Sequence, residues 1–170
     1  MKIFLNGFMG SGKSYWGKIW SEVSGLDYFD LDDMIEQQEG MTVDTIFEKK
    51  GESYFREKEN EMLRSFAGKD NCIVSCGGGT PCFSENMQWM NGQGITVYLQ
   101  TTPVKLLENI MLELGKRPML KNINKGEMLF FIEQKLKERS PFYLQATRHL
   151  DVTLLTSDSI KDIINSGNHS

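Results

Sequence analysis

The sequence predicts a single α/β domain in which helices flank a five-stranded parallel sheet. Three observations support this prediction. Short apolar runs alternate with amphipathic segments, a glycine-rich loop joins the first apolar run to the first amphipathic segment, and no linker or composition shift divides the 170 residues. A chain of this length can bury a core of its own. We therefore expect residues 1–170 to form one domain.

Each predicted strand is short and apolar, and turn residues or charges bound it. The five strands are predicted over residues 2–6, 28–31, 72–75, 95–99 and 151–155. The helices between and after them are predicted over residues 13–24, 33–39, 43–50, 53–67, 84–91, 103–112, 125–146 and 158–165. Thr102 before Pro103 is typical of an N-cap followed by proline at the first helical position, and Ser53 is a candidate cap for the helix over 53–67.

A phosphate-binding loop follows the first predicted strand. Residues 7–14 are GFMGSGKS and match the pattern G-x-x-x-x-G-K-[ST] in the strand-to-helix context that the pattern requires. Backbone N–H groups of this loop would bind the phosphates of a nucleoside triphosphate, Lys13 would contact the β- and γ-phosphates, and the Ser14 hydroxyl would bind Mg²⁺. The alternative, a flexible glycine loop with an unrelated lysine, does not explain this context.

The composition favours a small molecule as partner, with no nucleic acid and no membrane. The formal net charge is −4 without a basic stripe, and no apolar stretch approaches the length of a membrane span. The first ten residues lack the features of a secretory signal, so we expect a cytoplasmic location. Cys72, Cys76 and Cys82 are odd in number and distant in sequence from both histidines, which argues against a zinc site and indicates reduced thiols.

Two carboxylates follow the second predicted strand, at the sheet edge where open α/β sheets bind ligands. Alternation along an extended segment would point Asp30 and Asp32 in the same direction, toward the γ-phosphate. One would hold Mg²⁺ through its water shell, and the other would accept a proton from an attacking hydroxyl. Alternatively, Asp32 or Asp33 is only the N-cap of the helix predicted over 33–39.

Three consecutive glycines, Gly77 to Gly79, follow the third predicted strand. Glycines at a strand end commonly mark the close approach of a ligand or of another backbone segment, although a turn alone also needs them. Their place at the carboxyl end of a strand favours a role in binding the acceptor through backbone N–H groups.

Three arginines are candidates for contacts with anions, and each also has a simpler explanation. Arg56 has glutamates four residues before and three residues after it, so it can form solvated ion pairs on a helix face. Arg139 can be a surface charge near a proline-bent helix end. Arg117 lies in the Lys-, Asn- and Gly-rich segment 113–126, whose composition suits a mobile lid. A guanidinium that arrives with a lid would neutralise the transferring phosphoryl group, and a solvated loop charge is the alternative.

Taken together, these residues resemble the shikimate kinase family over residues 2–164. The phosphate loop is shared by a very large class of proteins, so the specific signals are the other motifs, which occur in family order. They are Asp30-x-Asp32, Phe55-Arg56, Gly77-Gly78-Gly79, Arg117-Pro118 and Arg139-x-Pro141-x-Tyr143. The resemblance implies a P-loop kinase fold with a mobile lid over residues 113–126 and substrate-binding helices over residues 32–67. It also implies transfer of the γ-phosphoryl group of ATP to the 3-hydroxyl of shikimate, with Mg²⁺, by a monomeric enzyme of aromatic amino acid biosynthesis.

On the nucleotide side, the resemblance implies contacts between ATP and a set of mostly loop residues. The set is Gly10, Ser11, Gly12, Lys13, Ser14, Tyr15 and Arg117. Lys13 would contact the transferring phosphates, and Arg117 would join it when the lid closes. Ser14 would bind Mg²⁺ directly, and Asp30 would bind it through the water shell of the ion.

On the acceptor side, the resemblance implies that Asp32 binds the shikimate hydroxyls and serves as the base. Arg56 and Arg139 would bind the shikimate carboxylate, helped by the backbone of Gly78 and Gly79. Paired arginines suit a planar carboxylate, and an acidic residue suits a neutral hydroxyl but would repel a phosphate acceptor. These charges therefore favour an alcohol over a nucleoside monophosphate as the acceptor.

The chain departs from the family pattern at two positions. Asn109 stands where the family usually has an arginine that packs on adenine, and Tyr15 stands where a threonine is usual. Two other functions are alternatives: a kinase of another small hydroxy acid such as gluconate, and a nucleotide-binding regulatory module that has lost catalysis. All the reacting groups named above are present, which argues against the second alternative.

Overall fold

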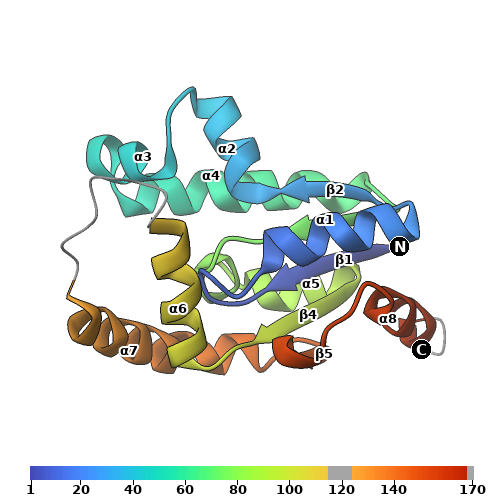
Figure 1. Ribbon diagram of the computed structural model, residues 1–170. Coiled ribbons are helices and arrows are strands. Elements are labelled where there is room, and N and C mark those ends of the chain that lie inside the picture. The colour runs from blue at the N-terminus through green and yellow to red at the C-terminus, as the bar shows by residue number, and fades with distance from the viewer. Residues whose placement is uncertain (115–123, 168–170) are drawn as a thin grey trace.

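The computed structural model describes residues 1–114 and 124–167, and these form a five-stranded parallel sheet flanked by helices, as predicted (Figure 1). The strand order is β2-β3-β1-β4-β5, so β1 lies at the centre of the sheet. The strands are β1 (Lys2–Asn6), β2 (Asp27–Asp30), β3 (Cys72–Ser75), β4 (Ile95–Gln100) and β5 (Arg148–Asp151). All four strand pairings are parallel, which brings every carboxyl end to one edge of the sheet.

Eight α-helices and three short 3₁₀ turns lie within the described residues. The helices are α1 (Lys13–Ser24), α2 (Leu31–Glu39), α3 (Val43–Lys50), α4 (Glu52–Arg64), α5 (Asn86–Gln93), α6 (Pro103–Leu114), α7 (Lys125–Tyr143) and α8 (Ser159–Gly167). The 3₁₀ turns are η1 (Ser65–Gly68), η2 (Thr80–Cys82) and η4 (Val152–Leu154). Figure 1 shows α2, α3 and α6 beyond the carboxyl ends of the strands. None of the described helices combines the length and the apolarity needed to cross a membrane.

Alternation along the central strands divides the core between the two faces of the sheet. Ile3 and Leu5 of β1 pack with Trp20 of α1 and with α8 on one face. Phe4 points to the other face, where α2, α3, α4, α5 and α7 contribute the partner side chains. A third, smaller cluster beside the start of α1 contains Phe8 and joins α6 to α7. Both faces of the sheet are therefore covered, and its carboxyl edge is left for the loops.

Several element boundaries differ from the predicted ones for local reasons. The helix predicted from residue 84 begins at Asn86, because Ser84 and Glu85 have φ values of 51° and 53°, outside the right-handed helical region. Gly51, not Ser53, is the N-cap of α4, and the segment predicted as one helix over 53–67 divides into α4 and η1. The helix predicted over 125–146 ends at Tyr143.

The last strand is displaced from its predicted position. The prediction was 151–155, whereas β5 is Arg148–Asp151 and the apolar residues after it form the 3₁₀ turn η4. The predicted cap at Thr102 is confirmed, since its Oγ1 accepts a hydrogen bond from the backbone N–H of Lys105 at 3.3 Å. Most of the predicted lid over residues 113–126, including Arg117, lies outside the described residues.

Candidate functional site

The phosphate loop occupies the turn between β1 and α1, at the carboxyl edge of the sheet (Figure 1). Gly10 and Gly12 have φ values of 81° and 91°, in the left-handed region that favours glycine. The backbone N–H of Ser11 donates to the carbonyl of Phe8 at 3.1 Å, which closes the loop on itself. The helix α1 begins at Lys13, so its first unpaired N–H groups face the loop. This arrangement matches the predicted anion cradle.

The Lys13 ammonium group is held inside the loop that precedes it. Its Nζ donates to the carbonyls of Gly7 at 2.7 Å and of Phe8 at 3.0 Å. Burial lowers the pKa of Lys13 to about 8, and the negative charge of Asp32 opposes this shift. A polyphosphate would offer stronger acceptors than two neutral carbonyls, so the lysine is placed to exchange partners when a nucleotide binds.

Asp30 joins the end of β2 to the start of α1. Its Oδ2 accepts hydrogen bonds from the Ser14 hydroxyl at 2.8 Å and from the Tyr28 hydroxyl at 3.2 Å. Its Oδ1 accepts from the backbone N–H groups of Asp32 at 3.1 Å and Asp33 at 3.4 Å, so Asp30 is the N-cap of α2. The cap that the alternative interpretation placed on Asp32 or Asp33 therefore belongs to Asp30.

Asp32 reaches the site from a helix and not from a strand. The strand β2 ends at Asp30 and α2 begins at Leu31, so the expected alternation of Asp30 and Asp32 along an extended segment is wrong. Asp32 nevertheless lines the same cavity of about 320 Å³ as Lys13 and Asp30. The first turn of α2, and not an extended strand, therefore brings Asp32 to the cavity that contains Lys13.

The Asp32 carboxyl group is partly buried and incompletely paired. Its Oδ1 has no hydrogen-bond partner among the described residues. Burial, and then the charges of Asp30 and Glu59, raise the pKa of Asp32 to about 6, although Lys13 opposes the shift. A carboxylate that lines the cavity and has this pKa is suited to a ligand hydroxyl, because it remains ionised at neutral pH.

The glycine run after β3 brings the charged groups of the site together. A Cβ atom on Gly77 would lie 2.9 Å from Asp32 Oδ1, and one on Gly78 would lie 3.1 Å from Arg139 Nη1. A Cβ atom on Gly79 would lie 2.5 Å from Arg56 Nη2. Each glycine therefore leaves room for one charged side chain, and larger residues would displace those side chains.

Arg56 makes the predicted helix ion pairs and also lies against the glycine run. Its Nη1 contacts Glu59 Oε2 at 2.7 Å, and its Nε contacts Glu52 at 3.4 Å. Glu59 is fully buried, and its other oxygen accepts a hydrogen bond from the Thr80 hydroxyl at 2.5 Å. The ring of Phe83 lies 4.2 Å from the guanidinium carbon. The ion pair with Glu59 thus fixes the orientation of Arg56. The guanidinium remains beside Gly79 while it makes this ion pair.

Arg139 and Tyr143 approach the same loop from α7. The guanidinium of Arg139 lies over the Phe8 ring at 5.4 Å, which places it between the phosphate loop and Gly78. Tyr143 is fully buried, and its hydroxyl donates to the Gly78 carbonyl at 2.5 Å. Burial raises the pKa of Tyr143 well above its usual range, so this hydroxyl stays protonated as a donor.

Glu59, Thr80 and Tyr143 make structural contacts that the sequence does not indicate. Glu59 entered only as a possible surface ion-pair partner of Arg56, and Tyr143 only as part of a motif. Their contacts join residues 21 and 65 positions apart in the chain, which no local pattern reveals. The one available signal was a glutamate three residues after Arg56, at helical spacing.

A second cavity of about 370 Å³ adjoins the phosphate loop on the side of α6. It shares Gly10, Gly12 and Tyr15 with the first cavity. Asn109 of α6 also lines it, and its Nδ2 donates to the Gly10 carbonyl at 2.8 Å. The two cavities therefore form one extended site around the loop.

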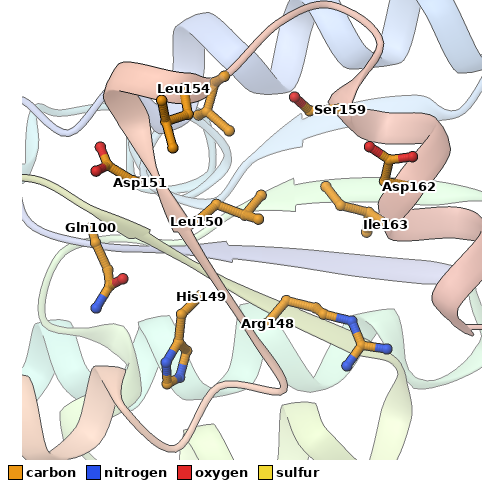
Figure 2. A pocket seen from close by; sticks show the side chains of 10 residues that line it. Gln100, Arg148, His149, Leu150, Asp151, Leu154, Ser159, Asp162 and Ile163 are labelled. Atoms are coloured by element: carbon orange, nitrogen blue, oxygen red, sulfur yellow. The ribbon is translucent and has the colours of Figure 1, made fainter.

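A larger hollow of about 610 Å³ lies between β5 and α8. Figure 2 shows Leu150 of β5 and Ile163 of α8 in its wall, with Leu154 at its rim. It shares no lining residue with either cavity at the phosphate loop. Size alone therefore does not locate the site, because the convergent charges and the anion cradle lie elsewhere.

The candidate metal ligands of the site are the oxygen atoms of Ser14 and Asp30. Within residues 1–114 and 124–167, no three His, Cys, Asp or Glu side chains converge as ligands of a metal ion. Cys72, Cys76 and Cys82 are free thiols. The Ser14 hydroxyl and the Asp30 carboxylate form a pair of hard oxygen donors, which fits a Mg²⁺ ion that keeps waters and phosphate oxygens as its other ligands.

Comparison with known proteins gives consistent relatives. A family model described as shikimate kinase matches residues 9–166. The shikimate kinase of Parabacteroides distasonis is 39% identical over 97% of this chain and 96% of its own. The crystal structure of shikimate kinase from Bacteroides thetaiotaomicron has a TM-score of 0.86 at 36% identity, covering 98% of this chain and 95% of the other. The Acinetobacter baumannii enzyme in complex with shikimate has a TM-score of 0.80 at 30% identity, covering 97% of this chain and 91% of the other.

Proposed function

The chain belongs to the shikimate kinase family, and from this membership we propose that it transfers the γ-phosphoryl group of ATP to the 3-hydroxyl of shikimate. The products are shikimate 3-phosphate and ADP, on the way to the aromatic amino acids. One observation carries the proposal: the glycine run places Asp32 and two arginines around a single loop that faces the phosphate loop. A negative group and a positive pair at that position match a ligand with hydroxyls at one end and a carboxylate at the other.

On the nucleotide side, Gly10, Ser11, Gly12 and the start of α1 bind the phosphates through backbone N–H groups. Lys13 leaves its two carbonyl partners for the β- and γ-phosphates. Ser14 and Asp30 would hold Mg²⁺, Asp30 through the water shell of the ion. The bound ion would neutralise negative charge on the phosphates.

On the acceptor side, Arg56 and Arg139 bind the shikimate carboxylate, and the backbone at Gly78 and Gly79 supports it. Glu59 and the Phe83 ring hold the Arg56 guanidinium in place before the ligand arrives. A preoriented guanidinium loses less conformational entropy on binding. Paired charge-assisted hydrogen bonds then fix the ring of the substrate relative to the phosphate loop.

The chemical step is an in-line displacement at the γ-phosphorus. The 3-hydroxyl oxygen of shikimate forms the new P–O bond, and the bond to the β–γ bridging oxygen breaks as ADP leaves. Asp32, which lines the cavity beside Lys13, orients the hydroxyl and accepts the proton. Lys13 stabilises the charge that develops on the transferring group and on the leaving oxygen. Arg117, outside the described residues, is proposed to add a second positive charge when the lid closes.

The proposal includes a monomeric, cytoplasmic enzyme that binds neither nucleic acid nor membrane. The net charge of −4 is unfavourable for contact with anionic phosphate backbones or anionic lipid surfaces. Size-exclusion chromatography with light scattering tests this part of the proposal, and a monomer has a mass of 19.5 kDa.

A coupled ADP-release assay tests the function. Purified enzyme with Mg²⁺ and ATP is given shikimate, gluconate or AMP. Of these three acceptors, we expect only shikimate to give turnover above background. Lys13→Ala serves as the inactive control, because it removes the phosphate contact and leaves the acceptor residues in place. Shikimate turnover no higher than that of this variant would refute the proposal, and turnover of gluconate instead would identify the rival hydroxy acid kinase.

A further inference from the structure

Tyr15 is an exposed aromatic ring at the junction of the two cavities around the phosphate loop. It retains 64% of its accessible surface, although it directly follows Ser14 in the first turn of α1. It lines both the cavity that contains Lys13 and the cavity on the side of α6. A ring this exposed contributes little to the core, so its surface is available for contact with a ligand in either cavity.

The orientation of this ring is restrained by its neighbour. The rings of Tyr15 and Trp16 have centroids 5.2 Å apart and an interplanar angle of 81°, a favourable edge-to-face contact. Trp16 is itself held against the loop, since a Cβ atom on Gly12 would lie 3.3 Å from its Cδ1. The contact with Trp16 therefore restricts the orientation of the Tyr15 ring, and the ring does not have to be ordered entirely by a ligand.

The direction of a bound nucleotide follows from the loop. The β- and γ-phosphates lie at Lys13, so the nucleoside must leave the first cavity on the side away from Asp32. The second cavity adjoins the loop at Gly10 and Gly12, and its volume of about 370 Å³ falls in the range of small-molecule sites. Tyr15 is the aromatic side chain common to both cavities.

The polar donors that α6 offers to the second cavity are already engaged. Asn109 Nδ2 donates to the Gly10 carbonyl at 2.8 Å, and Lys105 Nζ pairs with Glu108 at 3.2 Å. Asn109 thus braces the loop and Lys105 pairs within the helix, whereas the Glu113 carboxylate, which lines both cavities, is no donor. The uncovered π-face of Tyr15 is the complementary surface for a flat heterocycle.

We propose that the Tyr15 ring stacks against the nucleoside of the bound nucleotide and supplies a selective part of the affinity for ATP. This inference rests on the proposed function, because it concerns the same nucleotide. It assigns to Tyr15 a contact with the base or ribose, separate from the phosphate contacts of the loop. The contribution of the ring is therefore absent for a ligand that has the phosphates but no nucleoside.

Calorimetric titration of the full chain with MgATP and with magnesium tripolyphosphate, without shikimate, tests the inference. Tyr15→Ala should weaken ATP binding by roughly five- to twentyfold, the lower part of the range for aromatic stacking on a base, and leave tripolyphosphate binding unchanged. Tyr15→Phe keeps the ring and should retain the wild-type affinity for both ligands. Phe130→Ala is the matched control, because Phe130 is 62% exposed on α7 and lines neither cavity.

Two results would overturn the inference. Equal losses for ATP and tripolyphosphate in Tyr15→Ala would mean that the residue supports the loop, and unchanged affinity for both would mean that the ring is merely exposed. In either case wild-type turnover of shikimate would leave the proposed function standing. The opposite combination is also distinguishable. If Tyr15→Ala weakens ATP binding as expected but the wild-type protein does not phosphorylate shikimate, the proposed function is refuted and the nucleoside contact is retained.

Discussion

Asp32 is subject to opposing electrostatic influences. Burial and the neighbouring carboxylates disfavour its ionised form, and the Lys13 ammonium favours it. The result is a pKa of about 6, which leaves the group ionised at neutral pH but more basic than an exposed aspartate. A proton acceptor gains from such a value, because it is both available and sufficiently basic. The same value has a cost in stability, since an ionised carboxylate must be kept in a buried place.

Replacing Asp32 by asparagine should lower turnover and raise stability at neutral pH. The raised pKa means that the folded state binds the proton more tightly than the unfolded state, so the stability contributed by Asp32 is present at low pH and is lost as pH rises through about 6. Asp32→Asn removes that loss. We expect the free energy of unfolding to increase by about 1–3 kcal/mol at pH 7 and to change little at pH 4. Denaturant titrations at the two pH values measure this difference.

The same variant should lose about 10²- to 10⁴-fold in turnover, the usual contribution of a positioned base. Asp33→Asn is the control, because Asp33 is an exposed neighbour on α2 whose side chain is outside the cavity. Full activity in Asp32→Asn would remove the base assignment. A stability gain of the same size at both pH values would show that its origin is not the titration of Asp32.

The pH dependence of kcat/KM should be bell-shaped. With both substrates below saturation, this parameter reports groups of the free enzyme. Asp32 must be ionised and Lys13 must be protonated, so activity should rise through a pKa of about 6 and fall through a pKa of about 8. Asp32→Asn should abolish the acid limb and move the alkaline limb to lower pH, because the charge of Asp32 raises the pKa of Lys13. A profile that stays flat between pH 5 and 7 in the wild type would contradict the role of Asp32.

At the scale of the elements, the loop between β3 and η2 leaves the space that Arg56 and Arg139 occupy. Gly79 has a φ value of −92°, which alanine adopts without strain, so a substitution there tests space alone. The added methyl group would overlap the Arg56 guanidinium, with Nη2 at 2.5 Å and Nη1 at 2.8 Å. Because these atoms end a flexible side chain, Arg56 can move aside and the fold is retained.

Gly79→Ala should therefore raise the KM for shikimate about tenfold or more and leave the KM for ATP unchanged, as expected for a weakened charge-assisted contact. Gly92→Ala is the control, because nothing lies within 4 Å of a Cβ atom there and alanine favours the helix α5. Steady-state kinetics with each substrate varied in turn distinguish the two outcomes. An equal rise in both KM values would show that the substitution disturbs the whole loop and not Arg56 alone.

The elements also show which parts of the site a single sequence can predict. The phosphate loop is contiguous and follows a fully buried strand, so its pattern and its structure agree. The edge strand β5 was misplaced because three of its four residues, Arg148, His149 and Asp151, are polar or charged, while the apolar residues that follow form a 3₁₀ turn. Asp32 lines the cavity with Lys13 and Asp30 from α2 and not from a strand, because the cap at Asp30 begins the helix earlier than the alternation pattern indicated.

Across the whole molecule, the cavity with Lys13 and Asp32 lies at the carboxyl edge of the parallel sheet, and tight backbone packing is found at its amino edge. The glycine loops at the carboxyl edge leave space for charged side chains and a ligand, whereas the amino edge is packed against backbone. Gly94, just before β4, shows the contrast: a Cβ atom there would collide with the Lys2 carbonyl oxygen and lie 2.9 Å from Lys2 Cβ. A strand backbone, unlike the end of an arginine side chain, cannot move aside without disturbing the pairing of β1 with β4.

Gly94→Ala should consequently destabilise the protein without altering the site. Overpacking of this kind costs about 1–3 kcal/mol, which corresponds to a fall in Tm of roughly 2–12 °C for a domain of this size. At 25 °C the kcat and both KM values should equal those of the wild type, the reverse of the result expected for Gly79→Ala. Thermal unfolding monitored by circular dichroism, with kinetics on the same samples, makes the comparison. If Gly94→Ala changed the KM for either substrate while the protein remained folded, the packing of the amino edge would be coupled to the site, and the separation inferred from the sheet would not hold.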